Sequence, residues 1–309
     1  MVHAPNAAVR LLALVMATAL FAAPAAQGED VATRLLDDSA AEVRQYWTPE
    51  RMANAIPARG LSGAASPRVA PRRGSFHSRV RKVRRFPKRT HGKVFFTMNG
   101  TDFVCSGTVV DAPSRSLVWT AGHCVYEPGL LGAGFADNWL FVPAFGPGGK
   151  KPFGEWPATQ LATTEQWQDA GPLLGFDFDP TFDLGAATVA RSGEKRIQRV
   201  VGARRIAFNR SRDRRYHAFG YPARQPPPGF TGSRMFRCDS NYAGGDSSVG
   251  PPQPIRIHCD MTGGASGGGW VTKGGKVVSV TSYGYNNQPN SLYGPYMGDV
   301  ARKLYKEAG

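Results

Sequence analysis

From about residue 93 onward the sequence is a series of short apolar runs separated by turn-forming residues, and this pattern restricts the fold more than any other feature. The runs are rich in Val, Phe, Tyr and Trp and cover residues 93–98, 102–110, 116–121, 138–144, 184–190, 216–221, 255–261 and 276–285. Runs of this length and composition are typical of strands in a barrel or sandwich. The 37 glycines and 24 prolines among 309 residues argue against long helices. We therefore predict an all-β protein.

Helical spacing occurs at the C-terminal end of this region, over residues 297–307. Val300 and Leu304 are four residues apart, and Met297 falls on the same face. We predict antiparallel β-structure closed by a C-terminal α-helix. The sequence has no repeat of solenoid or propeller period and no zinc, Walker or EF-hand spacing. We accordingly expect neither a metal nor an organic cofactor.

The N-terminus has the pattern of a secretory signal peptide. Arg10 precedes an apolar run at residues 11–26, which ends in small residues around a cleavage-type Ala-Pro-Ala-Ala sequence. At 16 residues this run is short for a membrane span, and no later segment reaches 18 apolar residues. We predict that residues 1–26 are a signal peptide, that the protein is secreted, and that it has no membrane association after signal removal. Export also favours paired cysteines.

Residues 27–89 differ in composition from the rest of the chain. A short helix is expected near Thr48, where a capping residue is followed by Pro49. Between residues 68 and 93 there are eleven Lys or Arg and no acid, a composition that favours an exposed linker. The segment could be a solvated tail, a nucleic-acid-binding arm or a pro-segment cut within the basic run at residues 81–85. We favour the pro-segment, which leaves a domain at residues 90–309.

Residues 105–124 carry the first group with chemical meaning. Cys105 begins a strand-like run, and Thr-Ala-Gly-His-Cys occupies residues 120–124. These residues resemble the chymotrypsin family of serine proteases, in which a cysteine on one strand bonds the cysteine after the catalytic histidine. The resemblance implies two packed β-barrels with the site between them, a catalytic His123 and a Cys105–Cys124 disulfide. Such a bridge could contribute about 3 kcal/mol. The alternative is a structural histidine in the core.

The second group is the segment Thr-Phe-Asp-Leu-Gly-Ala-Ala at residues 181–187, in which Asp183 opens an apolar strand. It resembles the segment that carries the catalytic aspartate in the family. The resemblance implies that Asp183 accepts a proton from Nδ1 of His123, which fixes the tautomer of the ring and stabilises the imidazolium. Asp177 and Asp179 are nearby carboxylates, and a surface acid at a strand start is the alternative.

The third group is Thr-Gly-Gly-Ala-Ser-Gly-Gly at residues 262–268, similar to the family's segment around the nucleophile. The resemblance implies a nucleophilic Ser266. The glycines on both sides let the backbone bend so that the amides of Gly264 and Ser266 converge as an oxyanion hole. In isolation such a segment could be a glycine-rich hairpin or a phosphate-binding loop. The chain order His, Asp, Ser favours the protease interpretation.

Two positions depart from the family pattern. Ala265 stands where chymotrypsin-like enzymes have the aspartate that binds the new N-terminus, so that contact cannot be the activation switch here. Gly269 replaces a proline that is usual in the family. The Thr-Gly-Gly-x-Ser-Gly pattern is closer to the secreted bacterial branch that includes glutamyl endopeptidases, in which a removable pro-segment is common.

The specificity pocket is less well defined. Ser282, Tyr283 and Gly284 resemble the family segment that pairs with substrate backbone, and they are expected to form one wall of the primary pocket. Thr281 stands where glutamyl endopeptidases have a histidine, which argues against specificity for Glu. Asp260 lies six residues before Ser266, the offset of a pocket-base aspartate that would bind Lys or Arg, but a solvated or structural Asp260 is the alternative.

The remaining cysteines, Cys238 and Cys259, are expected to pair with each other, because the other two are assigned by the motif. His217 and His258 lie in strand-like runs without a serine-glycine partner, so core or surface roles are favoured. Residues 191–215 hold ten basic and two acidic side chains, which we interpret as a solvated loop rather than a polyanion site.

Together these features predict a secreted serine endopeptidase, made as a pro-enzyme, that acts as a monomer on protein or peptide substrates and binds no nucleic acid. The alternative is a protease-fold binding protein with weak catalysis that recognises polyanions or cell wall. The formal charge of +15 first suggests such a partner. Residues 1–93 carry +10 of this charge, however, so most of it lies in segments that we expect to be removed.

Overall fold

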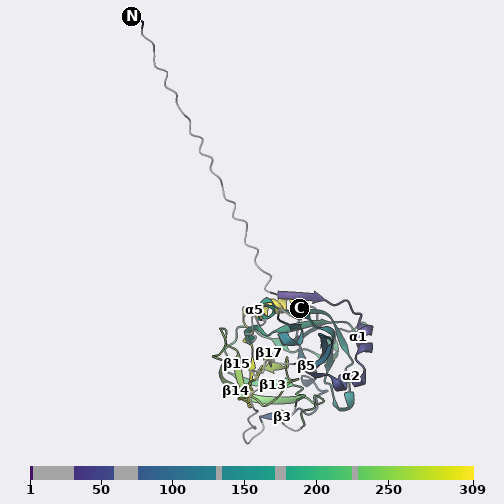
Figure 1. Cartoon of the computed structure of the whole chain (residues 1–309). Helices are drawn as coiled ribbons and strands as arrows, with labels where there is room; N and C mark the ends of the chain where they lie inside the picture. The colour runs from purple at the N-terminus through teal and green to yellow at the C-terminus, as the bar shows by residue number, and fades with distance from the viewer. Residues whose placement is uncertain (3–30, 59–75, 130–133, 171–178, 225–228) are drawn as a thin grey trace.

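A computed structural model describes residues 1–2, 31–58, 76–129, 134–170, 179–224 and 229–309 (Figure 1). The predicted signal peptide lies outside these residues apart from Met1 and Val2. The first sheet consists of β1 (Val31–Leu35), β2 (Ile56–Pro57), β4 (His91–Met98), β5 (Thr101–Val109), β6 (Leu117–Thr120), β9 (Asp137–Pro143), β10 (Trp156–Thr164) and β11 (Gly185–Val189). The second consists of β3 (His77–Arg79), β12 (Arg205–Ile206), β13 (Arg215–Gly220), β14 (Phe236–Gly245), β15 (Ile255–His258), β16 (Gly269–Val271), β17 (Lys276–Val280) and β18 (Ser291–Gly294).

The remaining elements lie in the connections between these strands, except for α5, which follows the last strand. A separate hairpin pairs β7 (Tyr126–Glu127) with β8 (Gly134–Phe135). The α-helices are α1 (Ala40–Tyr46), α2 (Pro49–Asn54), α3 (Glu165–Gln168), α4 (Ile197–Val201) and α5 (Asp299–Ala308). The 3₁₀ turns are η1 (Lys88–Thr90), η2 (Gly122–Cys124), η3 (Pro147–Gly149) and η4 (Pro180–Phe182).

The first sheet closes into a six-stranded barrel. Its strands run in the order β10, β11, β6, β5, β4 and β9, and β9 pairs back onto β10 through Phe141 opposite Trp156. β1 and β2 are added to this barrel from outside, on β10 and β5 respectively. Because the barrel closes without them, neither strand is needed to complete it.

The second sheet runs in the order β12, β17, β16, β13, β14, β15 and β18, and β3 pairs with β14. Figure 1 shows this sheet beside the first barrel, with β3 at its margin. The predicted all-β architecture is confirmed; the first of the two predicted barrels is closed, and the second corresponds to this sheet, for which the described strands show no closing pair. The pairing is antiparallel except for two two-residue pairs, β2 with β5 and β12 with β17.

The C-terminal helix predicted from the spacing of Val300 and Leu304 is present as α5. Its buried face consists of Ala301, Leu304 and Ala308. The helix returns to the first barrel, where the backbone oxygen of Gly309 accepts a hydrogen bond from the amide of Ser114 at 2.7 Å. No described helix is long and apolar enough to cross a membrane.

The expectation of an exposed linker between residues 68 and 93 is wrong for the part that the structure describes. β3 pairs with β14, Val80 is buried, and all of β4 is buried. The basic side chains of Arg79 and Arg81 point to solvent while the backbone makes the sheet contacts. Composition missed this arrangement because backbone hydrogen bonds are independent of side-chain charge. The helix expected near Thr48 is confirmed as α2, which Thr48 caps.

Candidate active site

The turn η2 and the residue after η4 bring His123 and Asp183 together at the edge of the first barrel. Nδ1 of His123 lies 2.8 Å from Oδ2 of Asp183, and the backbone amide of His123 donates to Oδ1 at 2.8 Å. Asp183 is 1% exposed. Because a carboxylate can only accept hydrogen bonds, Nδ1 carries the proton and Nε2 is the ring nitrogen that can accept one. The nearby Asp179 instead caps η4, and Asp177 lies outside the described residues.

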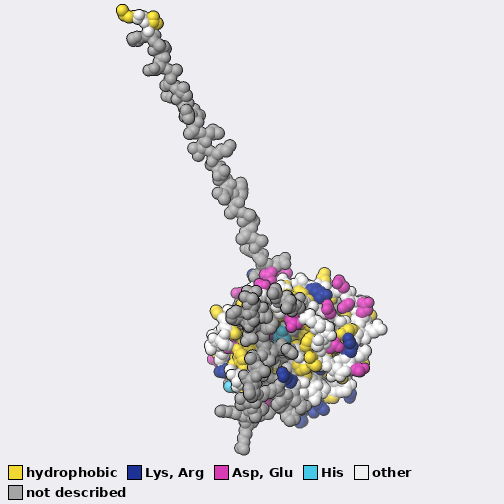
Figure 2. All heavy atoms as spheres, viewed as in Figure 1, with side chains coloured by type: hydrophobic (Ala, Val, Ile, Leu, Met, Phe, Trp, Pro, Cys, Tyr) yellow, Lys and Arg dark blue, Asp and Glu magenta, His cyan; other side chains and the backbone are white. Residues whose placement is uncertain are grey.

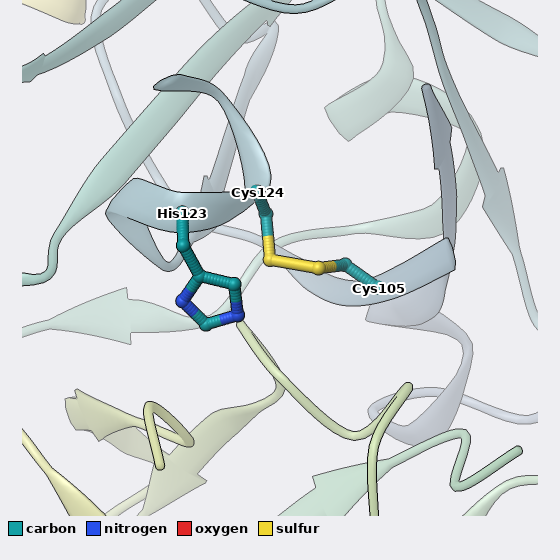
Figure 3. A group of neighbouring side chains, drawn as sticks. All are labelled: Cys105, His123 and Cys124. Atoms are coloured by element: carbon teal, nitrogen blue, oxygen red, sulfur yellow. A yellow bond between two sulfur atoms is a disulfide. The ribbon is translucent and has the colours of Figure 1, made fainter. Parts of the chain in front are cut away.

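The predicted Cys105–Cys124 disulfide is present and fixes the backbone next to this histidine (Figure 3). Cys124 follows His123 in η2, and Cys105 lies on β5. The three side chains come within 4.8 Å of one another. Since the two sulfurs are bonded to each other, no thiolate is available, and this group is a structural support rather than a metal centre.

Ser282, in the segment that connects β17 and β18 of the second sheet, also contacts Asp183. Its hydroxyl donates a hydrogen bond to Oδ2 of Asp183, and both residues are buried. Asp183 therefore accepts hydrogen bonds from three donors, which hold the carboxylate in one orientation. From the sequence we expected Ser282 in the wall of the primary pocket. Its bond to Asp183 joins residues 99 positions apart, so no local sequence pattern could predict it.

The loop that carries Ser266 is held by β5 of the first barrel. The amide of Ser106 donates to the carbonyl oxygen of Ser266 at 2.7 Å, and the Ser106 hydroxyl donates to the carbonyl of Gly264 at 2.8 Å. Gly264 and Gly267 have φ of 92° and 77°, a conformation that favours glycine. No described residue accepts a hydrogen bond from the amides of Gly264 or Ser266. The amides of Gly264 and Ser266, the predicted oxyanion-hole donors, thus have no acceptor among the described residues. Ser106, which the sequence did not single out, supports the loop that carries them.

Ser266 and the ring of His123 do not form a hydrogen bond with each other in this structure. Nε2 of His123 is buried and has no hydrogen-bond partner among the described residues, and Ser266, which is 4% exposed, donates to none of them either. Hydrogen bonds between a nucleophile and its base are often long before substrate binds. His123 and Asp183 are thus joined by hydrogen bonds, whereas Ser266 is hydrogen-bonded to neither of them in the described part of the chain.

Asp260 is buried and its carboxylate is already bonded. Nδ1 of His77 lies 2.9 Å from Oδ1, and the amide of Phe76 donates to Oδ2 at 3.3 Å. The His77 ring also packs against Phe230, with ring centroids 4.6 Å apart. In this structure Asp260 serves as an attachment point for residues 76 and 77, which favours the structural alternative over a free pocket-base carboxylate.

Tyr283 belongs to a hydrogen-bonded cluster centred on Asp246, which the sequence did not single out. The Asp246 carboxylate accepts from the hydroxyls of Tyr283 at 2.5 Å, Tyr285 at 2.7 Å and Ser248 at 2.6 Å. Burial raises the pKa of Asp246, but these hydrogen bonds outweigh it and hold the pKa below its ordinary value. The cluster fixes the segment that contains the predicted wall residues Tyr283 and Gly284.

The other predicted structural residues lie in the second sheet. Cys238 and Cys259 form the expected disulfide between β14 and the end of β15. His217 hydrogen-bonds Asp239 on the neighbouring strand, and His258 stacks on Phe76. Neither histidine contacts Ser266 or Asp183, in agreement with the surface and structural roles that we expected.

Solved structures provide a further comparison. The chain is 34% identical to the protease Anisep from Arthrobacter nicotinovorans, over 71% of this chain and 95% of that one, with a TM-score of 0.62. It is 37% identical to the thermostable serine protease AL20 from an extremophilic microorganism, over 71% and 96%, with a TM-score of 0.64. A Glu endopeptidase has the same fold at 17% identity, over 76% and 98%, with a TM-score of 0.57. Neither protein-family models nor curated proteins gave a match.

The fold and these neighbours define the class of the protein as serine protease. With identities above 30% over nearly the full length of two neighbours, the chain belongs to the bacterial chymotrypsin-like serine proteases. About three tenths of this chain is not covered by those two neighbours.

Proposed function

We propose that this protein is a secreted serine endopeptidase that uses Ser266 as nucleophile, His123 as general base and Asp183 as the group that orients His123. The observation that carries the proposal is the three-donor environment of Asp183, which fixes a proton on Nδ1 of His123 and leaves Nε2 to accept another. A neutral, oriented imidazole next to a serine is the requirement for nucleophilic attack at neutral pH.

In the proposed reaction, Nε2 of His123 accepts the Ser266 hydroxyl proton as Oγ bonds to the scissile carbonyl carbon. The carbonyl oxygen becomes an oxyanion, which accepts hydrogen bonds from the amides of Gly264 and Ser266. His123 then returns the proton to the leaving amine as the peptide bond breaks, leaving an acyl group on Ser266. Water, deprotonated by His123, attacks this ester; the acid product leaves and Oγ regains its proton.

The test is the Ser266→Ala variant. We expect turnover of a peptide substrate to fall by about 10⁶, as complete loss of a nucleophile does in a measured protease, while the unfolding midpoint stays near that of the parent. A matched control is Ser233→Ala, which changes a serine whose hydroxyl bonds Thr231 and none of the proposed catalytic residues. Undiminished peptide hydrolysis by Ser266→Ala would refute the assignment, as would failure of a serine-directed phosphonofluoridate to label the processed protein at Ser266.

Secretion and processing are part of the proposal. The apolar run at residues 11–26 and the two disulfides support an exported protein. N-terminal sequencing of the secreted product tests both steps, because signal removal predicts a start after residue 26 and pro-segment removal predicts a later one. A secreted product that still began at Met1 would contradict both.

Polyanion binding is the second candidate, and one observation favours it. A cleft of about 330 Å³ is lined by Arg79, Arg81, Lys82 and Arg234, and no acidic residue is among its described lining residues. On the face shown in Figure 2, by contrast, acidic and basic side chains are interspersed. Retention on a heparin column that is lost in an Arg79→Ala, Arg81→Ala variant would support binding at this cleft; equal retention of the parent and variant would exclude it.

A further inference from the structure

The described N-terminal residues attach to the two halves of the molecule in different ways. Residues 77–80 are bonded to the second sheet, and residues 88–90 lead directly into β4 of the first barrel. β3 pairs with β14, the amide of Val80 donates to the carbonyl of Met235 at 2.9 Å, and Val80 and Thr90 are buried. Removing them would take a strand from the sheet and expose apolar surface. These residues are therefore part of the folded protease.

Residues 31–58 instead lie outside a barrel that closes without them (Figure 1). Their main anchor is Trp47, which is 1% exposed. The indole N–H of Trp47 donates to the carbonyl of Asn138 at 2.6 Å, and the centroid of its ring lies 5.4 Å from that of Phe95. The Tyr46 hydroxyl donates to Asp102 at 2.8 Å. A buried aromatic residue flanked by polar contacts is typical of a peptide bound at an interface, and residues 31–58 have this arrangement.

The C-terminal end of residues 31–58 reaches the catalytic loop. The amide of Ala58 donates to the carbonyl of Val104 at 3.1 Å, immediately before the cysteine that braces His123. Pro57 packs so closely on Gly263 that a Cβ added to this glycine would lie 3.0 Å from the Cβ of Pro57. Gly263 precedes the oxyanion-hole residue Gly264. Ala58 therefore contacts β5, and Pro57 contacts the residue that precedes Gly264.

We propose that residues 31–58 form a clasp, an inhibitory segment that binds the first barrel and obstructs the catalytic site with Pro57 and Ala58, whereas residues 76–90 stay in the mature enzyme. The inference rests on the proposed peptidase function and specifies its regulation. Maturation then requires hydrolysis of a peptide bond between Ala58 and Phe76, with one water consumed and a new carboxylate and amine formed. This position is upstream of the basic run at residues 81–85.

A cut of this kind leaves every described contact of the clasp intact. The severed clasp therefore remains bound until it dissociates or is degraded, and it should inhibit when added separately. The processed enzyme, assayed on a small peptide anilide, should be inhibited by a synthetic peptide of residues 31–58. Trp47→Ala in this peptide should weaken inhibition by about a hundredfold or more, because truncation of a buried aromatic anchor is costly.

The matched control is Leu35→Ala in the same peptide. Leu35 is 73% exposed, so its truncation should change inhibition by no more than about threefold. A peptide of residues 31–55, which keeps Trp47 and lacks Pro57 and Ala58, should bind the enzyme by calorimetry and leave hydrolysis of the anilide unaffected. Inhibition by this shorter peptide equal to that of residues 31–58 would overturn the assignment of the block to Pro57 and Ala58.

N-terminal sequencing of the mature enzyme completes the test. A start between residues 59 and 76 agrees with the clasp, and a start at or before Val31, or within residues 81–85, overturns it. An active enzyme that neither binds nor is inhibited by residues 31–58 also overturns it. If calorimetry shows binding but the processed protein hydrolyses no peptide, the binding of the clasp stands and the proposed catalytic function fails.

Discussion

Two histidine–aspartate pairs in this protein have almost the same geometry and different surroundings. Nδ1 of His123 lies 2.8 Å from Asp183, and Nδ1 of His77 lies 2.9 Å from Asp260. Both carboxylates are nearly inaccessible to solvent, with side chains 1% and 3% exposed. Distance and burial alone therefore do not distinguish a catalytic pair from a structural one.

The difference lies in what surrounds each pair. Asp183 is braced by the His123 amide and by Ser282, and the far nitrogen of His123 is directed to no hydrogen-bond partner in the described part of the chain. The His77 ring is packed against Phe230 and Phe236, and the residue starts β3. In the proposed mechanism the first pair keeps one ring nitrogen for proton transfer, whereas the second pair holds a chain segment on the sheet.

The largest expected effect separates the two pairs directly. Asp183→Asn should lower kcat by about 10⁴, because an amide can donate to Nδ1 and stabilise the wrong tautomer of His123. Asp260→Asn, the matched change in the other pair, should leave kcat on a neutral substrate within about tenfold and instead loosen residues 76–80. Steady-state kinetics of both processed variants measure the contrast.

Hydrogen exchange supplies the second measurement for this comparison. In a Ser266→Ala background, which prevents self-digestion, Asp260→Asn should increase exchange at the amides of residues 78–80, and Asp183→Asn should not. Equal losses of kcat in the two variants would mean that Asp260 participates in catalysis and that the comparison of surroundings is misleading.

A smaller effect is expected from Ser282→Ala, which removes one of the three donors to Asp183. Hydrogen bonds to charged groups contribute about 1.5–3 kcal/mol, so kcat should fall by about 10–100-fold with little change in KM. Ser282→Thr keeps the hydroxyl and should recover part of the loss. A change confined to KM would instead assign Ser282 to the substrate pocket wall, as the sequence suggested.

The proposed catalytic residues could be selected from the sequence because each lies in a compact local motif. His123 adjoins the disulfide cysteine, and Ser266 is flanked by glycines that its loop conformation requires. Their supports could not be predicted in this way. Ser106 contacts Gly264 across 158 residues, and Ser282 contacts Asp183 across 99. Serine is a common residue, and the residues next to Ser106 and Ser282 in the sequence do not indicate that either one contacts a residue so distant in the chain.

For residues 68–93 the sequence led to the opposite error, because their composition predicted an exposed linker and the described part is folded. Their many arginines suggested a solvated linker, yet one buried Val80 and the backbone pairing of β3 attach the chain to the second sheet. Side-chain charge at alternate exposed positions is compatible with a strand whose other face is buried. The strand β3 is only three residues long, too short for a recognisable alternation.

The smallest expected effect concerns His91, a histidine with no carboxylate partner among the described residues. His91 is 2% exposed, bonds Thr108 at 2.9 Å and stacks on Phe219. Burial, and then the nearby positive charge of Arg204, lower its pKa well below the ordinary value. His91 therefore stays neutral in the folded protein at pH values where the unfolded chain takes up a proton.

Stability from His91 should be fully present above about pH 6.5, the unfolded pKa. Below it, the free energy of unfolding should decrease by up to about 1.4 kcal/mol per pH unit, until the folded pKa is reached. Urea unfolding of the Ser266→Ala chain between about pH 5 and 7.5 measures this slope. His91→Gln should flatten it, whereas His258→Gln, which changes an exposed histidine, should not. Identical slopes in both variants would show that the first barrel and the second sheet hold His91 without excluding its proton.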